Sequence, residues 1–324
     1  MRIAVDGMGG DHAPLEIIAG SALAAGAHGV EVIVVGMPDQ VQPLLAAHPK
    51  LRFIPATQVV AMDEHPAQAV RSKPDSSMAV CARLCKQGEA DGWVSAGNSG
   101  AIMAAALFIQ GRIRGVERPA IGSVVPTQDG VAYFLDVGAN VDCKPEYLVQ
   151  FAEMGAVYAE GMLGVNRPRV GLLSNGEEPG KGDELVRDVY TRLQNSSLNF
   201  IGNVEGKDVF AGRADVIVAD GFVGNIAIKM AEATADFLFK TLRDEIPSTL
   251  QGKIGGLMIR SGIRRIRDRI DWREFGGAPL LGIDGVAVVA HGRSDARAMK
   301  NAIRVANEAA ERGLTGKIRE AVGR

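Results

Sequence analysis

The sequence is poor in the residues that define several common protein classes. It has only three cysteines, and aromatic residues make up 5% of the chain. Cys81 and Cys85 stand at helical spacing among apolar neighbours, which favours buried thiols over metal ligands, and Cys143 stands apart. The stretch MRIAVDG lacks the basic and apolar regions of a secretory signal peptide. We therefore expect a cytoplasmic protein without disulfides.

Strong charge and long apolar runs are also absent. The formal net charge is -2 and the isoelectric point is near 6.2, which excludes an overall basic, nucleic-acid-binding protein. No apolar run reaches the roughly 18 residues that a membrane-spanning helix needs. We expect no nucleic acid partner and no transmembrane segment.

The common cofactor and catalytic motifs are incomplete. The stretch GMGGDH lacks the third glycine of a dinucleotide fingerprint, and GEEPGKG is one residue short of a P-loop. Around Ser99, GNSGA lacks the last glycine of a nucleophile elbow, and Ser95 fits that motif no better. The five histidines are scattered and no HExxH occurs. We therefore expect no nucleotide cofactor, no metal and no serine nucleophile.

The chain does carry a clear α/β pattern. It has 324 residues, of which 47% are hydrophobic, so we expect one α/β catalytic unit over residues 1–324. Strand-like runs such as RIAVD and VEVIVVG alternate with helical patterns, which predicts a mostly parallel sheet flanked by helices. Residues 120–138 predict an antiparallel hairpin, so the sheet should be mixed.

Most of the predicted strands end in glycine, asparagine, aspartate or serine, and a helix follows. Carboxyl ends of strands and N-termini of helices are where α/β folds bind anions, so these ends predict one glycine-rich rim for a phosphate-sized ligand. The loops concerned are residues 6–12, 95–101, 136–142, 174–184, 219–225 and 290–296.

Several residues of this rim allow a structural or a functional interpretation. Asp11 is expected to cap the helix after the first loop, with Pro14 in its first turn. Lys181 is either a point charge for the anion or an ordinary solvated lysine. The loop asparagines either line the site or act as turn and cap residues: Asn98, Asn140, Asn175 and Asn225.

A second region, residues 227–272, breaks the α/β rhythm. Apolar residues recur there at steps of three to five, among arginines and lysines that only Asp268 opposes over residues 253–269. This pattern predicts a projecting helical hairpin that dimerises at its base and touches an anionic membrane at a tip near residues 255–259. Two alternatives are a helical hairpin that only forms a dimer and an ordinary surface helix with solvated arginines.

The sequence resembles the PlsX family of acyl-ACP:phosphate acyltransferases. The start MRIAVDGMGGDHAP resembles that family's N-terminal signature, and SAGNSGA, DVGAN, SNGEEPGKG, DGFVGN and residues 277–292 resemble its other blocks in the same order. The resemblance implies a Rossmann-like, three-layer fold similar to isocitrate and isopropylmalate dehydrogenases, and a homodimer. It implies transfer of a long-chain fatty acyl group from acyl-carrier protein to phosphate, and delivery of the acyl phosphate to a membrane acyltransferase by a peripherally membrane-associated enzyme.

The same resemblance implies roles for particular residues. Lys181 would be the catalytic lysine and Asn225 the amide that polarises the thioester carbonyl. His12 would either donate a proton or brace its loop, and Asp6, Asp11 or Asp136 would orient backbone and lysine. The phosphate pocket would comprise Gly9, Gly10, Asp11, His12, Asn98, Ser99, Gly100 and Asn140.

The chemistry implied fits the missing motifs. Phosphate is itself the nucleophile, and a thiol leaves without a strong general acid, so no catalytic triad is needed. The basic hairpin would meet the acidic carrier protein or the membrane through Lys253, Leu257, Met258, Arg260, Arg264 and Arg265, with Arg267 as a further carrier contact. Two alternatives stay open: a small-acyl phosphotransacetylase and an NAD-dependent hydroxy-acid dehydrogenase of related fold.

Overall fold

The computed structural model describes residues 1–322, so residues 323 and 324 of the predicted unit lie outside it. In this part of the chain eleven strands form one mixed sheet with the order β3-β2-β1-β4-β11-β10-β5-β6-β9-β7-β8. The strands are β1 Arg2–Asp6, β2 Glu31–Gly36, β3 Arg52–Pro55, β4 Gly92–Ser95, β5 Ala120–Pro126, β6 Val131–Leu135, β7 Arg169–Leu173, β8 Asn199–Val204, β9 Val216–Val218, β10 Ala278–Leu281 and β11 Ala287–Val289.

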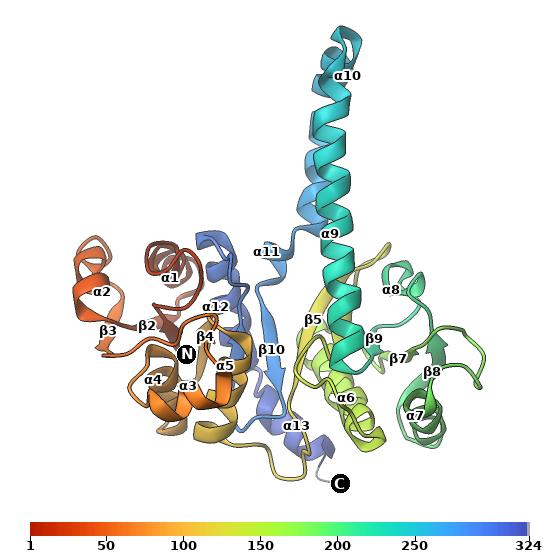
Figure 1. Ribbon diagram of the computed structural model, residues 1–324, viewed down its shortest axis with the longest axis horizontal. Helices are drawn as coiled ribbons and strands as arrows, with labels where there is room; N and C mark the ends of the chain where they lie inside the picture. Colours follow the sequence, from red (N-terminus) through yellow and green to blue (C-terminus); the bar gives the residue numbers. More distant parts are fainter. Residues whose placement is uncertain (323–324) are drawn as a thin grey trace.

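Helices cover the sheet and one pair projects from it (Figure 1). The α-helices are α1 Leu15–His28, α2 Pro38–Leu45, α3 Pro66–Ser72, α4 Ser77–Lys86, α5 Ser99–Ala105, α6 Pro145–Tyr158, α7 Glu184–Gln194, α8 Asp208–Ala211, α9 Gly221–Glu245, α10 Leu250–Ile270, α11 Trp272–Phe275, α12 Ala296–Glu311 and α13 Leu314–Val322. Two π-helical turns, Ala106–Gln110 and Ala159–Leu163, and one 3₁₀ turn, Ile246–Ser248, complete the description.

The alternation of side chains along the strands builds a core on each face of the sheet. In β1, Ile3 and Val5 pack with Ile17 of α1 and Met299 of α12, while Ala4 points to the other face and packs with the group that contains Cys81 of α4. Helices therefore cover both faces, as the sequence predicts for a mostly parallel sheet.

The sheet contains two groups of parallel strands that run in opposite senses. Strands β3, β2, β1, β4 and β11 are mutually parallel, and so are β6, β9, β7 and β8. Antiparallel pairings of β10 with β11 and with β5, and of β5 with β6, join the two groups. The predicted hairpin over residues 120–138 is thus confirmed as β5 and β6, whereas β3 and β10 were not predicted.

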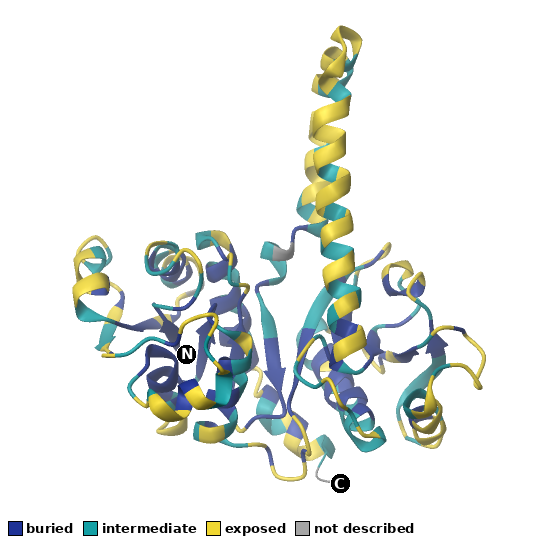
Figure 2. Cartoon of the chain, in the orientation of Figure 1, coloured by how far each residue is buried: buried dark blue, intermediate teal, exposed yellow. Residues whose placement is uncertain are grey.

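The projecting pair consists of α9 and α10, joined by the turn at residues 246–249. Most of its residues are exposed (Figure 2). The predicted tip, residues 255–259, lies inside α10 rather than at the turn, because the glycines there continue the helix and Thr249 caps its start. Among the described helices, none combines the length and apolar character needed to cross a bilayer.

Candidate functional site

Three of the predicted loops meet at the ends of β1, β4 and β11. Asp6 ends β1 and accepts a hydrogen bond from Oγ of Ser95, the last residue of β4, at 2.7 Å. The backbone N–H of Asp11 donates to the carbonyl of Gly292, in the loop that follows β11, at 2.8 Å. These bonds bring residues 6–12, 95–101 and 290–296 together.

Glycine is required where these loops touch. Gly10 has φ of +106°, and a Cβ there would lie 3.0 Å from the Gly292 carbonyl oxygen. A Cβ on Gly9 would lie 2.8 Å from the backbone nitrogen of Gly97. The close approach of the three loops therefore depends on these glycines.

Asp6 organises the backbone beneath these loops. It is fully desolvated, and this burial raises the pKa of its carboxyl group although hydrogen bonds from Ser77 and Ser95 oppose the shift. Its other oxygen accepts the N–H of Met8 at 3.1 Å, and Ser95 Oγ accepts the N–H of Gly97 at 3.1 Å. Sequence analysis tested Ser95 only as a nucleophile and missed this positioning contact.

The expected cap at Asp11 is wrong. Helix α1 begins at Leu15, and Pro14 occupies its N-cap without a side-chain cap bond. The loop needs extra residues to reach Gly292, so Asp11 lies before the helix instead of at its start. Asp11 and His12 are both exposed, which leaves their side chains open to the solvent side of this loop group.

Two other loops, after β6 and β9, form a second group around Asp136. The buried carboxylate of Asp136 accepts five hydrogen bonds, from the backbone N–H groups of Ile121, Gly138, Ala139 and Asn140 and from Asn140 Nδ2. Burial raises the pKa of Asp136 despite these donors. The carbonyl of Asn140 in turn accepts the N–H of Gly221, the first residue of α9, at 2.7 Å. Asp136 thus fixes this loop against the start of α9.

The four loop asparagines differ in how their side chains are used. Asn98 caps α5 through Ala101 N–H and donates to two carbonyls, Asn140 donates to Pro119 and Asp136, and Asn175 accepts from Gly182 N–H. Asn225, on the first turns of α9, has no side-chain hydrogen bond within residues 1–322. The Asn225 side chain lies beside Gly138: a Cβ added to Gly138 would lie 3.5 Å from Cγ of Asn225. Asn225 is therefore the asparagine whose amide remains available to a ligand.

Lys181 lies in the loop after β7, and its alkyl chain packs against Gly176. A Cβ added to Gly176 would lie only 2.7 Å from Cγ of Lys181. It is exposed, and in the described chain its ammonium group forms no ion pair although Glu177 and Glu178 share its loop. The loop is held by the bond from Asn203 Nδ2 to the Glu178 carbonyl, at 2.9 Å. Lys181 is thus an available cation in a glycine-rich loop.

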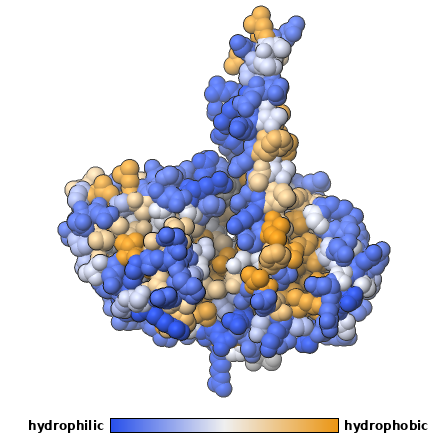
Figure 3. Space-filling view, in the orientation of Figure 1, coloured by the Kyte–Doolittle hydropathy of each residue, from blue (hydrophilic) through white to orange (hydrophobic). Residues whose placement is uncertain are grey.

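The loops predicted to form one rim fall into three groups in the structure. The first comprises the loops after β1, β4 and β11, the second the loops after β6 and β9, and the third the Lys181 loop after β7. Helix α9 links the first two groups: it carries Asn225 at its start, and Arg293 after β11 forms an ion pair with Asp236 further along it at 3.7 Å. Partial desolvation and the neighbouring Arg293 lower the pKa of His291. Of the charged residues on α9, Glu232 raises this pKa and Lys229 lowers it. Figure 3 shows hydrophobic side chains gathered at the foot of this helix.

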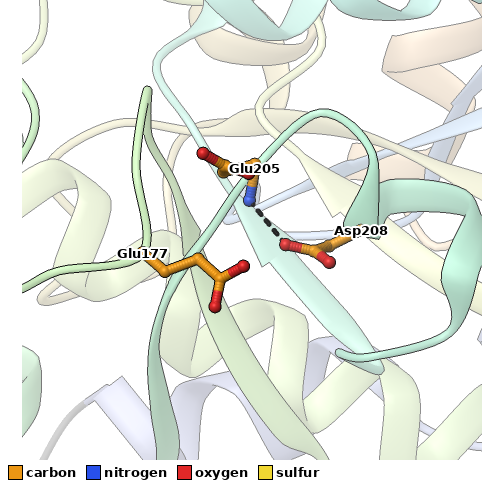
Figure 4. Close-up of side chains that lie close together, drawn as sticks. All are labelled: Glu177, Glu205 and Asp208. Atoms are coloured by element: carbon orange, nitrogen blue, oxygen red, sulfur yellow. Dashed lines mark hydrogen bonds between the residues drawn. The ribbon is translucent and has the colours of Figure 1, made fainter.

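A cluster of carboxylates near the Lys181 loop is a structural network. Glu177, Glu205 and Asp208 lie close enough to hold a metal ion (Figure 4). However, Arg213 pairs with Glu177 at 2.7 Å, and Lys207 pairs with Glu205 at 2.5 Å. These cations neutralise the acidic groups, so the cluster ties the β7 and β8 loops together.

The predicted hairpin contacts lie on two sides of α10. Lys253, Leu257, Arg260 and Arg264 line a groove toward α9. Met258 and Arg265 do not line it, because successive residues turn by about 100° around a helix axis. Leu257 and Met258 have 70% and 79% of their surfaces exposed, so both remain accessible in the chain.

The eleven-stranded mixed sheet, with helices on both of its faces, defines an α/β fold. The structure is similar to a phosphotransacetylase from Streptococcus pyogenes, with a TM-score of 0.66, 18% identity, and coverage of 96% of this chain and 94% of the other. It is also similar to 4-hydroxythreonine-4-phosphate dehydrogenase from Klebsiella pneumoniae, with a TM-score of 0.55, 16% identity, and coverage of 95% and 99%. At these identities the likeness establishes the fold alone.

The family follows from closer relatives. Residues 1–317 match the family model described as fatty acid synthesis protein. A phosphate acyltransferase of Desulfitobacterium hafniense (strain Y51) is 50% identical over 328 residues, covering 100% of this chain and 98% of the relative. One from Desulforudis audaxviator is 51% identical over 323 residues, covering 100% and 96%. The chain belongs to the fatty acid synthesis protein family, and it is an acyltransferase.

Proposed function

We propose that this chain is a phosphate acyltransferase that moves a long-chain fatty acyl group from acyl-carrier protein to inorganic phosphate, giving acyl phosphate for phospholipid synthesis. The observation that carries the proposal is the identity of about half of all residues with curated phosphate acyltransferases over the full chain. Further support comes from the loops, where the side chains of Lys181 and Asn225 make no ion pair or hydrogen bond within residues 1–322 and are available to a ligand.

The proposed chemistry uses the two available groups. Phosphate attacks the thioester carbon, the C–S bond breaks as the tetrahedral intermediate collapses, and the carrier thiolate leaves and takes up a proton from water. Lys181 neutralises phosphate or the developing oxyanion, and the Asn225 amide donates to the carbonyl oxygen. Support comes from the lack of any other partner for either side chain in residues 1–322.

The phosphate pocket is proposed at the two loop groups. Backbone N–H groups near Gly9, Gly10 and Gly100 and at the start of α5 supply donors, and His12 and Ser99 are exposed beside them. In this proposal Asp6 and Asp136 hold the backbone and do not touch the anion. Asp11, Asn98 and Asn140 border the pocket, and the last two contribute mainly by shaping their loops.

The whole chain acts in this proposal as one Rossmann-like catalytic unit related to isocitrate and isopropylmalate dehydrogenases, with the α9–α10 hairpin as its arm. The arm joins two copies near its base, and its far half meets the acidic carrier protein and an anionic membrane surface. Exposed Met258 and Leu257 beside Arg260, Arg264, Arg265 and Lys253 support a surface of this kind. The enzyme would then be a cytoplasmic, peripherally bound protein that hands acyl phosphate to a membrane acyltransferase.

The test compares acyl donors with and without phosphate. The purified chain is incubated with palmitoyl-carrier protein, and free carrier thiol is followed. Phosphate-dependent release is expected. If short-chain acyl-CoA is used instead and palmitoyl-carrier protein is left intact, the chain is a small-acyl phosphotransacetylase. Release of thiol from neither donor, with reduction of a nicotinamide cofactor by a hydroxy acid, would establish a dehydrogenase.

A further inference from the structure

One face of α9 connects the loop after β6 with the loop after β11. Helix positions 225, 229 and 236 lie within about 40° of one another around the axis, so they form one stripe. At one end of the stripe Asn225 lies beside Gly138, and at the other end Asp236 pairs with Arg293 at 3.7 Å. Lys229, about 6 Å along the axis from Asn225, therefore lies between these two loops.

The surroundings of His291, in the loop after β11, are consistent with this position of Lys229. Partial desolvation is the main cause that lowers the pKa of His291, and the charges of Arg293 and Lys229 lower it further. Glu232 and Asp11 raise the same pKa. Charge interactions fade beyond about 10 Å at ordinary ionic strength, so Lys229 lies near the group of loops to which His291 belongs.

The proposed phosphate pocket receives little positive charge from its own loops. A single lysine or arginine, Arg293, occurs in the five loop segments of the first two groups, which are residues 6–12, 95–101, 136–142, 219–225 and 290–296. Arg293 is already paired with Asp236. Asp11 borders the pocket and is itself acidic, so a further cation is needed to favour an anion there. Lys229 is placed to supply that charge.

The ammonium group of Lys229 is available to a ligand. Its side chain is exposed and makes no hydrogen bond or ion pair among the described residues. Glu232 and Asp11, the carboxylates that act on the same histidine, also form no ion pair in the described part of the chain. Neither of them therefore neutralises Lys229 by direct contact, and a strong acceptor such as phosphate can pair with it.

We propose that Lys229 binds the phosphate that attacks the thioester, in the space between Asn225 and the loop that carries His291. This assignment rests on the proposed function, because phosphate is the nucleophile of that reaction. Lys229 holds the anion as a point charge about one helical turn from the Asn225 amide, which donates to the thioester carbonyl. Its contribution is therefore to the binding of phosphate and not to the binding of the acyl donor.

The test compares the unaltered full chain with Lys229→Met, which removes the charge and keeps a long side chain. Equilibrium dialysis at constant ionic strength gives Kd for inorganic phosphate, and thiol release from palmitoyl-carrier protein gives KM for phosphate. Both constants should rise about 10- to 100-fold, the usual effect of losing a hydrogen bond to a charged group. Lys229→Arg keeps the charge and should restore most of the affinity. KM for palmitoyl-carrier protein should stay nearly unchanged.

The matched control is Lys50→Met, the same charge change at an exposed lysine before β3, and it should bind phosphate as the unaltered chain does. Circular dichroism and melting curves check the folding of each variant. Unchanged phosphate Kd in folded Lys229→Met would overturn the proposal, as would an equal loss of affinity in Lys50→Met.

Two further outcomes separate the possible roles of Lys229. A rise in KM for palmitoyl-carrier protein with unchanged phosphate Kd would also overturn the proposal, because it would assign Lys229 to a phosphodiester on the donor's prosthetic arm. Phosphate binding that depends on Lys229, in a chain that releases no thiol, would support Lys229 as a phosphate ligand and refute only the proposed function.

Discussion

Ser95 and Asp6 join two neighbouring strand ends through a hydrogen bond of 2.7 Å from Ser95 Oγ to Asp6 Oδ2. The bond is buried, and the same hydroxyl accepts the N–H of Gly97, so it couples the β1 and β4 loops. If these loops form the phosphate pocket, the shape of that pocket depends on Ser95 although Ser95 makes no contact with the anion.

The variant Ser95→Ala should raise KM for phosphate and lower stability by about 1–3 kcal/mol, because it removes a donor from a buried carboxylate. Initial rates against phosphate concentration and thermal melting measure the two effects. Ser21→Ala is the control, since the buried Ser21 hydroxyl has no hydrogen-bond partner among the described residues and its loss should cost little. A Ser95→Ala protein with unchanged KM and melting temperature would contradict the positioning role.

Asn225 and Asn98 should respond differently to truncation. Asn225→Ala should lower kcat with little change in melting temperature, because its amide has no hydrogen bond to lose in the described chain. Asn98→Ala should lower stability by about 0.5–2 kcal/mol, the usual contribution of a helix N-cap. Calorimetry and steady-state kinetics on both variants check this contrast. Full activity of a folded Asn225→Ala protein would remove Asn225 from the mechanism.

The base of the hairpin should be sensitive to acid. Asp271 follows α10; burial opposes its ionisation, but hydrogen bonds from the side chain and backbone of Arg273 bring the pKa of its carboxyl group below the ordinary value. Since the pKa is lower in the folded state, the stabilisation is present above the ordinary aspartate pKa of about 3.9 and is lost as the pH falls through the lower, folded value.

Asp271→Asn should therefore lower the melting temperature at neutral pH and flatten its decline between about pH 5 and pH 2. Melting curves over that range measure the effect. Glu117→Gln serves as the control, because the Glu117 carboxylate makes no ion pair in the described residues. If the melting temperatures of Asp271→Asn and of the unaltered chain fall in parallel with pH, the Asp271 carboxylate does not contribute to the acid sensitivity of folding.

Membrane contact through the hairpin is tested with vesicles. Leu257→Glu plus Met258→Glu places two negative charges on exposed apolar positions and should abolish sedimentation with anionic phosphatidylglycerol vesicles. Leu15→Glu plus Leu23→Glu makes the same change at two exposed leucines of α1 and should leave sedimentation intact. Equal sedimentation of both variants would place the membrane contact outside this part of α10.

The layered fold was predictable from local patterns, but the sheet order was not. Strands β3 and β10 were missed because each is four residues long and contains a proline, Pro55 or Pro279, which weakens a strand signal. The opposite sense of the two parallel groups arises from three successive antiparallel pairings, of β11 with β10, β10 with β5 and β5 with β6. The middle one of these pairs Leu280 with Ile121. Such pairing joins residues far apart in the sequence, and no local pattern encodes it.

The loops of the site were predictable from their glycines. Which of their polar side chains are hydrogen-bonded within the chain, and which are available to a ligand, was not predictable. Asn98 and Asn225 look alike in sequence, yet one caps a helix and the other has an available amide. That difference depends on whether the backbone places N–H groups beside the side chain. The contact of Ser95 with Asp6 likewise depends on the register of β1 and β4.

The most direct test of the account is trapping of the product with hydroxylamine, which converts an acyl phosphate to a hydroxamate. With palmitoyl-carrier protein, the chain should form hydroxamate only when phosphate is present, and folded Lys181→Ala should form it about 100- to 1,000-fold more slowly. Absence of phosphate-dependent hydroxamate, with folded protein and intact donor, would contradict the proposed transfer of an acyl group to phosphate.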